Sequence, residues 1–381
     1  MIYADNAATT KLDIDAFEAM KPFLLENYGN ASQPYSFGVK AKRAISEARK
    51  TIAECIGAEP EEIYFTSGGT ESDNWAIKMG SKVVKCNGNV ITSQIEHHAI
   101  LNACAALEKT GIEVKYLPVT HEAVVLPETL DQMISEKTSL VSVMMANNEV
   151  GSIQPIKELA DIAHNNRALF HTDAVQAVGH INIDVKNLNV DMLSASAHKF
   201  NGPKGIGFLY IKKEIDLQPF MDGGAQENRM RAGTENVAAI VGMAAALKNN
   251  YLYLGAFSKK MREIDDTFMN ELKINNILYK RNGSNNIIPG NISLSFKNVD
   301  AEVLLHRLDI LGLCISTGSA CDSQNTQVSH VLKAIKTIPE LENGTIRLSF
   351  GKNNTIDEAK QAAQLLIQVL KAIEGWNRNV S

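Results

Sequence analysis

The stretch IYFTSGGTESDN, residues 63–74, shows the pattern that decides the fold. An apolar run, Ile63-Tyr64-Phe65, leads into a short turn with adjacent glycines, and a helix-forming segment follows. A short apolar run that is bounded by turn residues predicts a buried β-strand. The stretch therefore predicts a strand, a turn and a helix in direct succession, which is one unit of an alternating α/β fold.

The same alternation continues to about residue 210. Further apolar runs lie at residues 90–92, 114–117, 140–144, 168–170, 192–194 and 206–210. Helical patterns lie between several of them, at residues 99–109, 127–136 and 155–165. This alternation predicts parallel βαβ units with helices on both faces of one sheet. Because ligands bind at the carboxyl ends of such strands, the residues directly after each run are the functional candidates.

The C-terminal third follows a different pattern, which predicts a compact α+β unit. Its expected strands lie at residues 291–296, 313–316 and 345–350, and its expected helices at 301–311 and 357–373. A helix over residues 237–251 is expected to carry the chain into this unit. We therefore predict an N-terminal segment (1–15), a large α/β domain (16–256) and a small domain (257–381) that carries Cys321. The first helix is expected to pack on the small domain.

Composition and charge narrow the class of protein. Hydrophobic residues make up 45% of the 381-residue chain and charged residues 21%, as is usual for a globular enzyme. A net charge of −5 offers no electrostatic footprint for nucleic acid or an acidic membrane. The chain has no apolar stretch of about eighteen residues, and its start, MIYADNAATT, lacks the basic and apolar parts of a secretory signal. We therefore expect a cytoplasmic protein that binds neither nucleic acid nor membrane.

The cysteines indicate neither a disulfide framework nor a structural zinc site. They are Cys55, Cys86, Cys104, Cys314 and Cys321. Their number is odd, none stand in C-x-x-C spacing and no histidine cluster joins them. Each is therefore either a buried apolar residue or a reactive thiol.

The turn after the first apolar run is a candidate phosphate site. Backbone N–H groups at a helix start, with the hydroxyls of Ser67 and Thr70 beside them, favour a bound phosphate. The turn lacks the GK[ST] of a nucleotide P-loop and the GxGxxG of dinucleotide sites, so it indicates neither ATP nor NAD. The alternative is a plain helix cap, with Thr70 as the cap and Asp73 in the first turn.

Two other strand ends carry candidate side chains. His97 follows the run at 90–92, where a histidine can stack on an aromatic cofactor or move protons; the alternative is a half-buried histidine with a structural role. Asp173 follows the run at 168–170, with Gln176 a short distance on. A buried carboxylate needs a partner, and a protonated pyridine nitrogen is one. The alternative is a helix cap.

Lys199 lies between an apolar run and a Gly/Pro turn, in SAHKFNGPKGIG (196–207). A desolvated lysine has a lowered pKa and can form a Schiff base, whereas a surface lysine at a turn is the ordinary alternative. A phosphate turn, an aromatic stacker, a pyridine-facing acid and a lysine all fall at strand ends of one domain. Chance agreement of all four is much rarer than any one of them, so together they favour a pyridoxal phosphate (PLP) site.

On these residues the chain resembles fold-type I PLP enzymes of the class V aminotransferase group. Within that group it resembles cysteine desulfurases of the NifS/IscS type. The resemblance runs from DNAATT (5–10) to the last helix. The other matching motifs are SGGTESDN (67–74), NNEVG (147–151), HTDAVQAVG (171–179), SAHKFNGPKGIG (196–207), RAGTEN (231–236), STGSACDS (316–323) and IRLSFG (346–351).

The resemblance implies roles for the residues at the cofactor ring and phosphate. Lys199 is the Schiff-base lysine, Asp173 faces the pyridine nitrogen and Gln176 faces the ring hydroxyl. His97 stacks on the ring and carries protons. The implied phosphate ligands are Gly69, Thr70, Ser196 and His198.

The resemblance also implies a homodimer and a substrate site. Thr234 of the AGT motif is offered to the phosphate in the other subunit. Asn148 reaches the cofactor or the substrate. Arg347 clamps the substrate carboxylate, which suits the bidentate geometry of a guanidinium.

Cys321 narrows the reaction. It lies in a Gly/Ser-rich stretch, residues 316–322, whose composition predicts a loop. By the resemblance, its thiolate attacks the sulfur of PLP-bound L-cysteine, which leaves a Cys321 persulfide and releases L-alanine. The loop then carries the sulfur to an acceptor protein, either a scaffold or a carrier, for iron–sulfur cluster, thio-cofactor or tRNA biosynthesis. No metal site is expected beyond Cys321 as a transient iron–sulfur ligand.

Two departures from the family pattern limit what the resemblance implies. The segment GGAQENR (223–229) stands where the family has GGGQERG, so the entrance contacts of Asn228 and Arg229 stay unassigned. The chain stops at Ser381 without the extended tail of scaffold-delivering members, so the acceptor stays open. The remaining alternatives are a selenocysteine lyase, a class V aminotransferase, a catalytically silent sulfur-relay subunit and, more distantly, a dinucleotide-binding protein.

Overall fold

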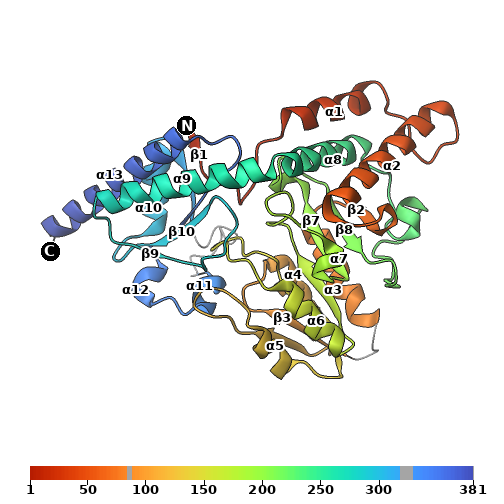
Figure 1. The fold of residues 1–381 in the computed structure, drawn as a ribbon, viewed down its shortest axis with the longest axis horizontal. Helices are drawn as coiled ribbons and strands as arrows, with labels where there is room; N and C mark the ends of the chain where they lie inside the picture. Colours follow the sequence, from red (N-terminus) through yellow and green to blue (C-terminus); the bar gives the residue numbers. More distant parts are fainter. Residues whose placement is uncertain (84–87, 318–328, 381) are drawn as a thin grey trace.

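A computed structural model gives the fold of residues 1–83, 88–317 and 329–380 (Figure 1). Two bodies are joined by a pair of successive helices, α8 (Val237–Leu252) and α9 (Leu254–Ile274). Only Tyr253 separates the two helices. Within the described residues, no helix combines the length and the apolar character that crossing a bilayer requires.

The large domain is built on a seven-stranded sheet with the order β2-β8-β7-β6-β5-β3-β4. Its strands are β2 (Ile63–Thr66), β8 (Gly207–Ile211), β7 (Met192–Ser196), β6 (Leu169–Asp173), β5 (Thr138–Ser142), β3 (Asn89–Ser93) and β4 (Val114–Leu117). Strand β8 is antiparallel to both of its neighbours, and the other adjacent pairs are parallel. The predicted α/β fold with a mostly parallel sheet is confirmed.

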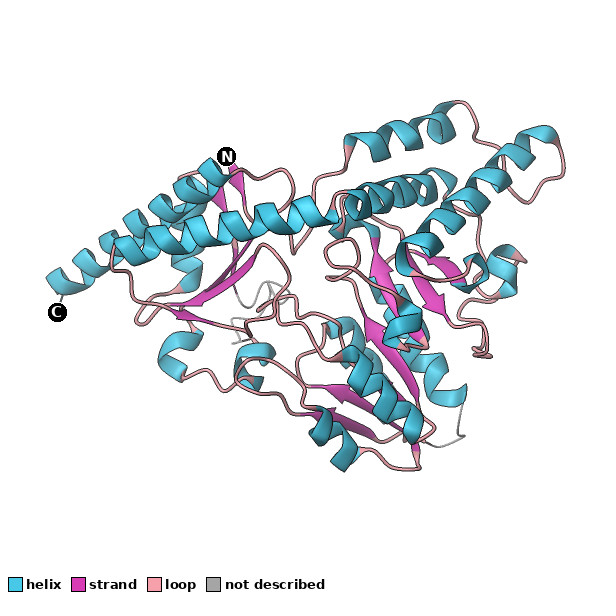
Figure 2. Cartoon of the chain, viewed as in Figure 1, coloured by secondary structure: helices cyan, strands magenta, loops and turns pink. Residues whose placement is uncertain are grey.

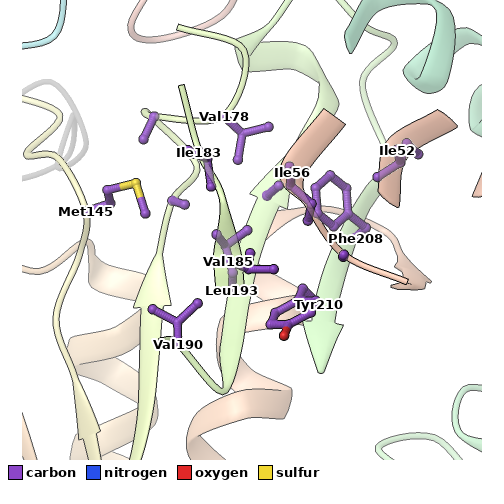
Figure 3. Close-up of a cluster of buried hydrophobic side chains, with 14 of the residues drawn as sticks. Ile52, Ile56, Met145, Val178, Ile183, Val185, Val190, Leu193, Phe208 and Tyr210 are labelled. Carbon is purple, nitrogen blue, oxygen red and sulfur yellow. The ribbon is translucent and has the colours of Figure 1, made fainter. Parts of the chain in front are cut away.

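Helices cover both faces of this sheet (Figure 2), because successive residues of each strand point to opposite faces. On β7, for example, Met192 joins one apolar cluster and Leu193 the other. The first face is covered by α3 (Gly69–Val83) and α4 (His98–Glu108). The second face is covered by α2 (Ser36–Ile56), α5 (Pro127–Met133), α6 (Ile156–Asn165) and α7 (Val185–Leu188). Figure 3 shows Ile52 and Ile56 of α2 beside Phe208 of β8 in this second cluster.

The small domain is a four-stranded antiparallel sheet with helices on one face. Its strands, in order, are β12 (Ser316–Thr317), β13 (Thr345–Ser349), β10 (Asn291–Ser295) and β9 (Lys280–Arg281). Its helices include α9, α10 (Ala301–Ile310), α12 (Pro339–Glu342) and α13 (Ile356–Val380). On β13, Ile346 and Leu348 join the core under the helices. Arg347 therefore lies on the opposite face, toward the large domain.

The N-terminal segment joins the two domains. Strand β1 (Ile2–Tyr3) pairs with β11 (Leu313–Cys314) in the small domain. Helix α1 (Ile14–Leu25) instead packs on α8, where a Cβ at Gly242 would meet the Met20 side chain at 2.5 Å. The expectation that the first helix packs on the small domain is therefore wrong, because this close helix–helix approach holds α1 on the large-domain side.

One short helix belongs to the small domain in sequence and to the large domain in packing. Helix α11 (His330–Ala334) buries Val331 and Leu332 in a cluster with Ile95 and Met144, which follow β3 and β5. The chain thus returns to the large sheet directly after residues 318–328.

Candidate active site

A cavity of about 310 Å³ lies where the strand ends of the large sheet meet the N-terminal segment and β13. It is lined by Ala7, Ala8, Gly69, Thr70, Asp73, His97, Met144, Asn148, Asp173, Val175, Gln176, Ser196, His198, Lys199 and Arg347. Of the predicted site residues that the structure describes, all except Thr234 line it. Cys321 lies outside the described residues.

The strand directions explain this convergence. Strands β2, β3, β5, β6 and β7 run the same way, so their carboxyl ends share one edge of the sheet. Asp173 is the last residue of β6 and Ser196 the last residue of β7. His97 and Asn148 lie in the segments that follow β3 and β5.

The candidate phosphate turn lies between β2 and α3. A Cβ at Gly69 would meet Val175 Cγ2 at 2.6 Å, so the turn approaches the wall too closely for any side chain there. The cap expected as the alternative does not form, since α3 begins at Gly69 and Asp73 is buried against the sheet. The backbone N–H groups of this first turn point to an anion site, and Ser196 Oγ would lie 3.5 Å from a Cβ at Gly68.

Lys199 is held inside the cavity rather than on the surface. It ends the short η2 helix (Ala197–Lys199) that follows β7. Its Nζ donates to the carbonyl oxygens of Ala7, at 2.6 Å, and Ala8, at 2.9 Å. Gln176 Nε2 donates to the same Ala7 oxygen at 3.1 Å. The N-terminal segment therefore forms the wall opposite the sheet.

His97 is neutral and oriented by α4. Its Nδ1 accepts a hydrogen bond from the Ala99 N–H at 3.2 Å, so the proton of the neutral ring belongs on Nε2. Burial, then the charges of Lys199 and His98, lower the pKa of His97 to about 4. A neutral, fixed ring suits stacking on a cofactor and proton transfer at Nε2.

The second histidine of the site, His198, is neutral for the same reasons. Burial and then the charges of Lys199 and Lys204 lower the pKa of His198 to about 4. Its Nδ1 lies 3.1 Å from Thr9 Oγ1. A neutral imidazole beside the phosphate turn can donate a hydrogen bond there without a second charge.

Asp173 fits a cationic ring nitrogen. It is 4% exposed, and its Oδ1 accepts a hydrogen bond from the Val175 N–H at 2.9 Å. Burial raises the pKa of Asp173, while that hydrogen bond and the charge of Lys199 lower it in part. A buried carboxylate is stable only beside a positive charge or hydrogen-bond donors. A protonated pyridine nitrogen at Asp173 would supply that positive charge. The residues present therefore fit PLP, with Lys199 on the aldehyde side and the α3 turn at the phosphate.

Arg347 is fixed by two distant segments. Its Nη1 donates to the Asn148 carbonyl oxygen and its Nη2 to Asp5 Oδ1, each at 2.8 Å. Its Nε is buried without a hydrogen-bond partner in the part of the chain that the structure describes. Arg347 lines the cavity, and Nη1 and Nη2 each carry a second N–H that can bind an anionic ligand.

The segment that contains Thr234 lies beside the phosphate turn, and Thr234 itself is exposed. Within this segment, Glu227, Asn228 and Arg229 have φ values of 47°, 55° and 68°, an unusual run of left-handed residues. Glu227 holds the run in place, since its carboxylate pairs with Arg49, with 2.6 Å between Nη2 and Oε1. The unusual sequence of residues 223–229 is therefore anchored to the large domain.

The described residues on either side of Cys321 are anchored at the cavity. Ser316 on β12 pairs with Arg347 on β13. Ser329 Oγ donates to Glu149 Oε2 at 2.5 Å, and His330 Nε2 lies 2.9 Å from the Glu96 carbonyl oxygen. Glu149 and Glu96 are sequence neighbours of Asn148 and His97.

Asp73 was predicted only as part of the alternative helix cap. No role was predicted for the other unassigned residues of the site, which are Asp5, Ala7, Ala8, Met144 and Val175. Asp5 and the two alanines lie in the DNAATT motif, whose match to the family was the one available signal. In the described ranges, no group of three or more His, Cys, Asp and Glu side chains is placed to hold a metal ion.

The fold and this cavity define a PLP-type enzyme of the class V aminotransferase group. The family model described as aminotransferase class-V matches residues 2–361. The chain therefore belongs to the aminotransferase class-V family, which confirms the resemblance found in the sequence.

Curated relatives narrow the family further. The cysteine desulfurase IscS of Dictyoglomus turgidum is 46% identical over 375 residues, which cover 98% of this chain and 95% of the relative. The cysteine desulfurase IscS of Methanosarcina thermophila is 44% identical and covers 100% of this chain and 93% of its own length. The putative cysteine desulfurase IscS 1 of Bacillus subtilis is 41% identical, with coverages of 98% and 99%.

Solved structures share the fold. A NifS-like protein superposes with a TM-score of 0.91 at 36% identity and covers 97% of this chain and 99% of that one. SspA in complex with cysteine superposes with a TM-score of 0.82 at 34% identity, with coverages of 92% and 99%.

Proposed function

We propose that this chain is a PLP-dependent cysteine desulfurase. It takes the sulfur of L-cysteine onto Cys321 as a persulfide and releases L-alanine. The observation that carries the proposal is the meeting of Lys199, Asp173, His97 and Arg347 around one cavity. The names of the most similar curated relatives support the same activity.

The cofactor, when bound, supplies an electron sink at the substrate α-carbon. Lys199 would hold it covalently, and Asp173 would pair with its ring nitrogen. The first turn of α3, with Ser196 and His198, would hold its phosphate. His97, neutral and with its proton on Nε2, would cover the ring and move protons at the substrate.

Arg347 binds the substrate carboxylate. Because Asp5 and the Asn148 carbonyl already fix its guanidinium, little side-chain entropy is lost when the carboxylate arrives. A structural relative, SspA, was solved in complex with cysteine, which supports cysteine as the substrate. The Asn148 side chain lines the same wall of the cavity.

The described thiols are poor candidates for the sulfur acceptor. Burial raises the pKa of Cys55 to about 11 and that of Cys104 to about 12, and burial also raises the pKa of Cys314. None of these three lines the cavity.

The Cys321 thiolate attacks the substrate sulfur, an S–S bond forms and the C–S bond breaks. The electron pair of the C–S bond passes to the substrate carbon, which is then protonated to give alanine.

We also propose that the enzyme is a homodimer that delivers sulfur to an acceptor protein, a scaffold or a carrier. Thr234 is exposed beside the phosphate turn, where a second subunit can use it. Apolar side chains are exposed along α1, the connection after it and the start of α2: Ile14, Phe17, Leu24, Leu25, Tyr28, Tyr35 and Val39. An apolar surface of this kind marks a protein–protein interface.

The test is a product analysis of the purified protein supplied with PLP. We expect a visible absorption band, and equimolar alanine and sulfide from L-cysteine in the presence of a thiol reductant. Lys199→Ala should lose the band. If Cys321→Ala keeps full activity, the persulfide mechanism fails and the aminotransferase or selenocysteine lyase alternatives take its place.

A further inference from the structure

A cluster of polar side chains lies buried beneath the cavity, on the face of the sheet that α3 covers. Ser142, His171 and Ser194 come from three adjacent strands, β5, β6 and β7, and all point to this face. His171 Nδ1 lies 2.9 Å from Ser142 Oγ, and its Nε2 lies 3.0 Å from Ser194 Oγ. Both ring nitrogens are therefore engaged with hydroxyl groups.

Asp73 faces this cluster from α3. It is 1% exposed and lines the cavity together with Asp173. Its Oδ1 lies 3.9 Å from His171 Nε2 and has no hydrogen-bond partner in the described chain. An unpartnered buried carboxylate oxygen is rare in folded proteins and calls for an explanation.

No cation neutralises Asp73 among the residues that the structure describes. Burial lowers the pKa of His171 to about 3, so this ring is neutral. The nearby titratable groups are acids, Asp173 on β6 and Glu96 after β3, and burial raises the pKa of Glu96 to about 8. Lys199 donates to the carbonyl oxygens of the N-terminal segment, and its charge acts on Asp173.

A carboxyl group in this setting keeps its proton. Burial and then the charge of Asp173 raise the pKa of Asp73 far above its ordinary value, while the nearby Ser194 hydroxyl opposes the shift. Two ionised carboxylates that line one buried site would repel each other.

We propose that Asp73 is a positioning residue that stays protonated behind Asp173, so that Asp173 alone carries negative charge at the deep end of the cavity. The inference rests on the proposed function only in placing a cationic ring nitrogen at Asp173. With Asp73 neutral, Asp173 ionises freely when that cation arrives. With Asp73 ionised, the same pairing would have to hold two negative charges.

The test compares thermal unfolding of wild-type and Asp73→Asn apoprotein between pH 5 and pH 8. If Asp73 is protonated in the folded state and ionised in the unfolded chain, folding takes up a proton. The folding stability of the wild type therefore falls as the pH rises. Asparagine removes that cost. We expect the melting temperature of Asp73→Asn, relative to wild type, to rise by about 2 °C or more per pH unit. The change of this difference in melting temperature with pH, rather than its absolute size, reports the proton taken up on folding.

Asp191→Asn is the matched control. Asp191 is also buried, but its Oδ2 accepts from the Phe170 N–H and faces His164 Nε2, each at 2.8 Å. Asp191→Asn should lower the melting temperature, but its difference from wild type should not rise with pH. Asp73→Ala gives a second test, since it removes the same proton: the slope should persist at a lower overall stability.

A flat or falling slope for both Asp73 variants would overturn the proposal. A wild-type protein that never binds PLP would contradict the proposed function instead. The apoprotein slope would still decide the role of Asp73.

Discussion

The guanidinium of Arg231 donates to both carboxylate oxygens of Glu71, with 2.8 Å between Nε and Oε1 and 3.1 Å between Nη2 and Oε2. Glu71 follows Thr70 in the first turn of α3, and its Oε2 also accepts from the Ser67 N–H at 2.9 Å. Arg231 belongs to the segment that contains Thr234. One half-buried ion pair thus joins the phosphate turn to the segment that we propose serves the second subunit.

Replacing Arg231 by lysine should weaken cofactor binding. Lysine cannot make the bidentate contact, so the α3 turn loses the support that orients its N–H groups. We expect the dissociation constant for PLP to rise about tenfold, the equivalent of about 1.4 kcal/mol. Titration of the visible band measures it. Arg229→Lys, on an exposed side chain of the same segment, is the control and should change the constant little.

Replacing Arg347 by lysine should separate substrate binding from cofactor binding. The ammonium of lysine cannot hold a carboxylate through two parallel bonds, and it leaves either Asp5 or the Asn148 carbonyl without a donor. We expect KM for L-cysteine to rise about a hundredfold, near 2.7 kcal/mol, with the visible band unchanged. Arg281→Lys, on an ion pair with Asp265, is the control. An unchanged KM would remove Arg347 from the substrate site.

Replacing Cys321 by serine should abolish sulfur transfer while cofactor and substrate still bind. The hydroxyl is a far weaker nucleophile toward sulfur than a thiolate. Steady-state assays should show at least about a hundredfold loss of alanine formation, with the substrate-induced change of the visible band retained. The wild-type rate should rise with pH as the thiol ionises. Cys314→Ser should keep activity, and a Cys321→Ser enzyme as active as wild type would refute the assignment.

Neutralising Glu149 should change how stability depends on pH. Burial raises the pKa of Glu149 to about 7, against the Ser329 hydrogen bond and the charge of Arg347. The folded state therefore binds this proton more tightly than the unfolded chain, and the wild type loses stability as pH rises through this range. Glu149→Gln should gain about 1–2 kcal/mol relative to wild type between pH 5 and pH 8. Urea unfolding measures this, and exposed Glu158→Gln should show no gain.

Breaking the Glu227–Arg49 pair should destabilise the large domain. Both side chains are largely buried, and Glu227 also accepts from the Phe65 N–H at 2.9 Å. Glu227→Gln would leave a buried guanidinium without its counter-charge, at a cost of about 3 kcal/mol. The comparison is Glu47→Gln, whose partner Arg43 is exposed, where the loss should stay below about 0.5 kcal/mol. Equal losses for the two variants would contradict this role.

The strands of the large domain were predictable because their apolar runs are short and bounded by turns. The run at 114–117 coincides with β4. The run at 168–170 underestimates β6, which continues through His171 and Thr172 to Asp173. These three residues are polar and yet buried, which a hydrophobic pattern cannot show.

The partners of the small-domain strands were not predictable. One strand was expected over residues 313–316, whereas the chain forms β11 and β12 in two different sheets. Strand β11 pairs with the N-terminal β1, and β12 pairs with β13. Local sequence carries no information on which distant segment supplies the hydrogen bonds of a short strand.

The sequence alone was sufficient to predict which side chains of the large sheet reach the site. Parallel strands share their carboxyl edge, so the position of Lys199, Asp173 and His97 after apolar runs was enough to bring them together. Only the tertiary structure decided what surrounds them. Asp5 and Arg347 are 342 residues apart and meet at 2.8 Å, and Asp73 Oδ1 is buried without a hydrogen-bond partner among the described residues. Contacts of this kind depend on how separate layers pack, and no local pattern of residues specifies that packing.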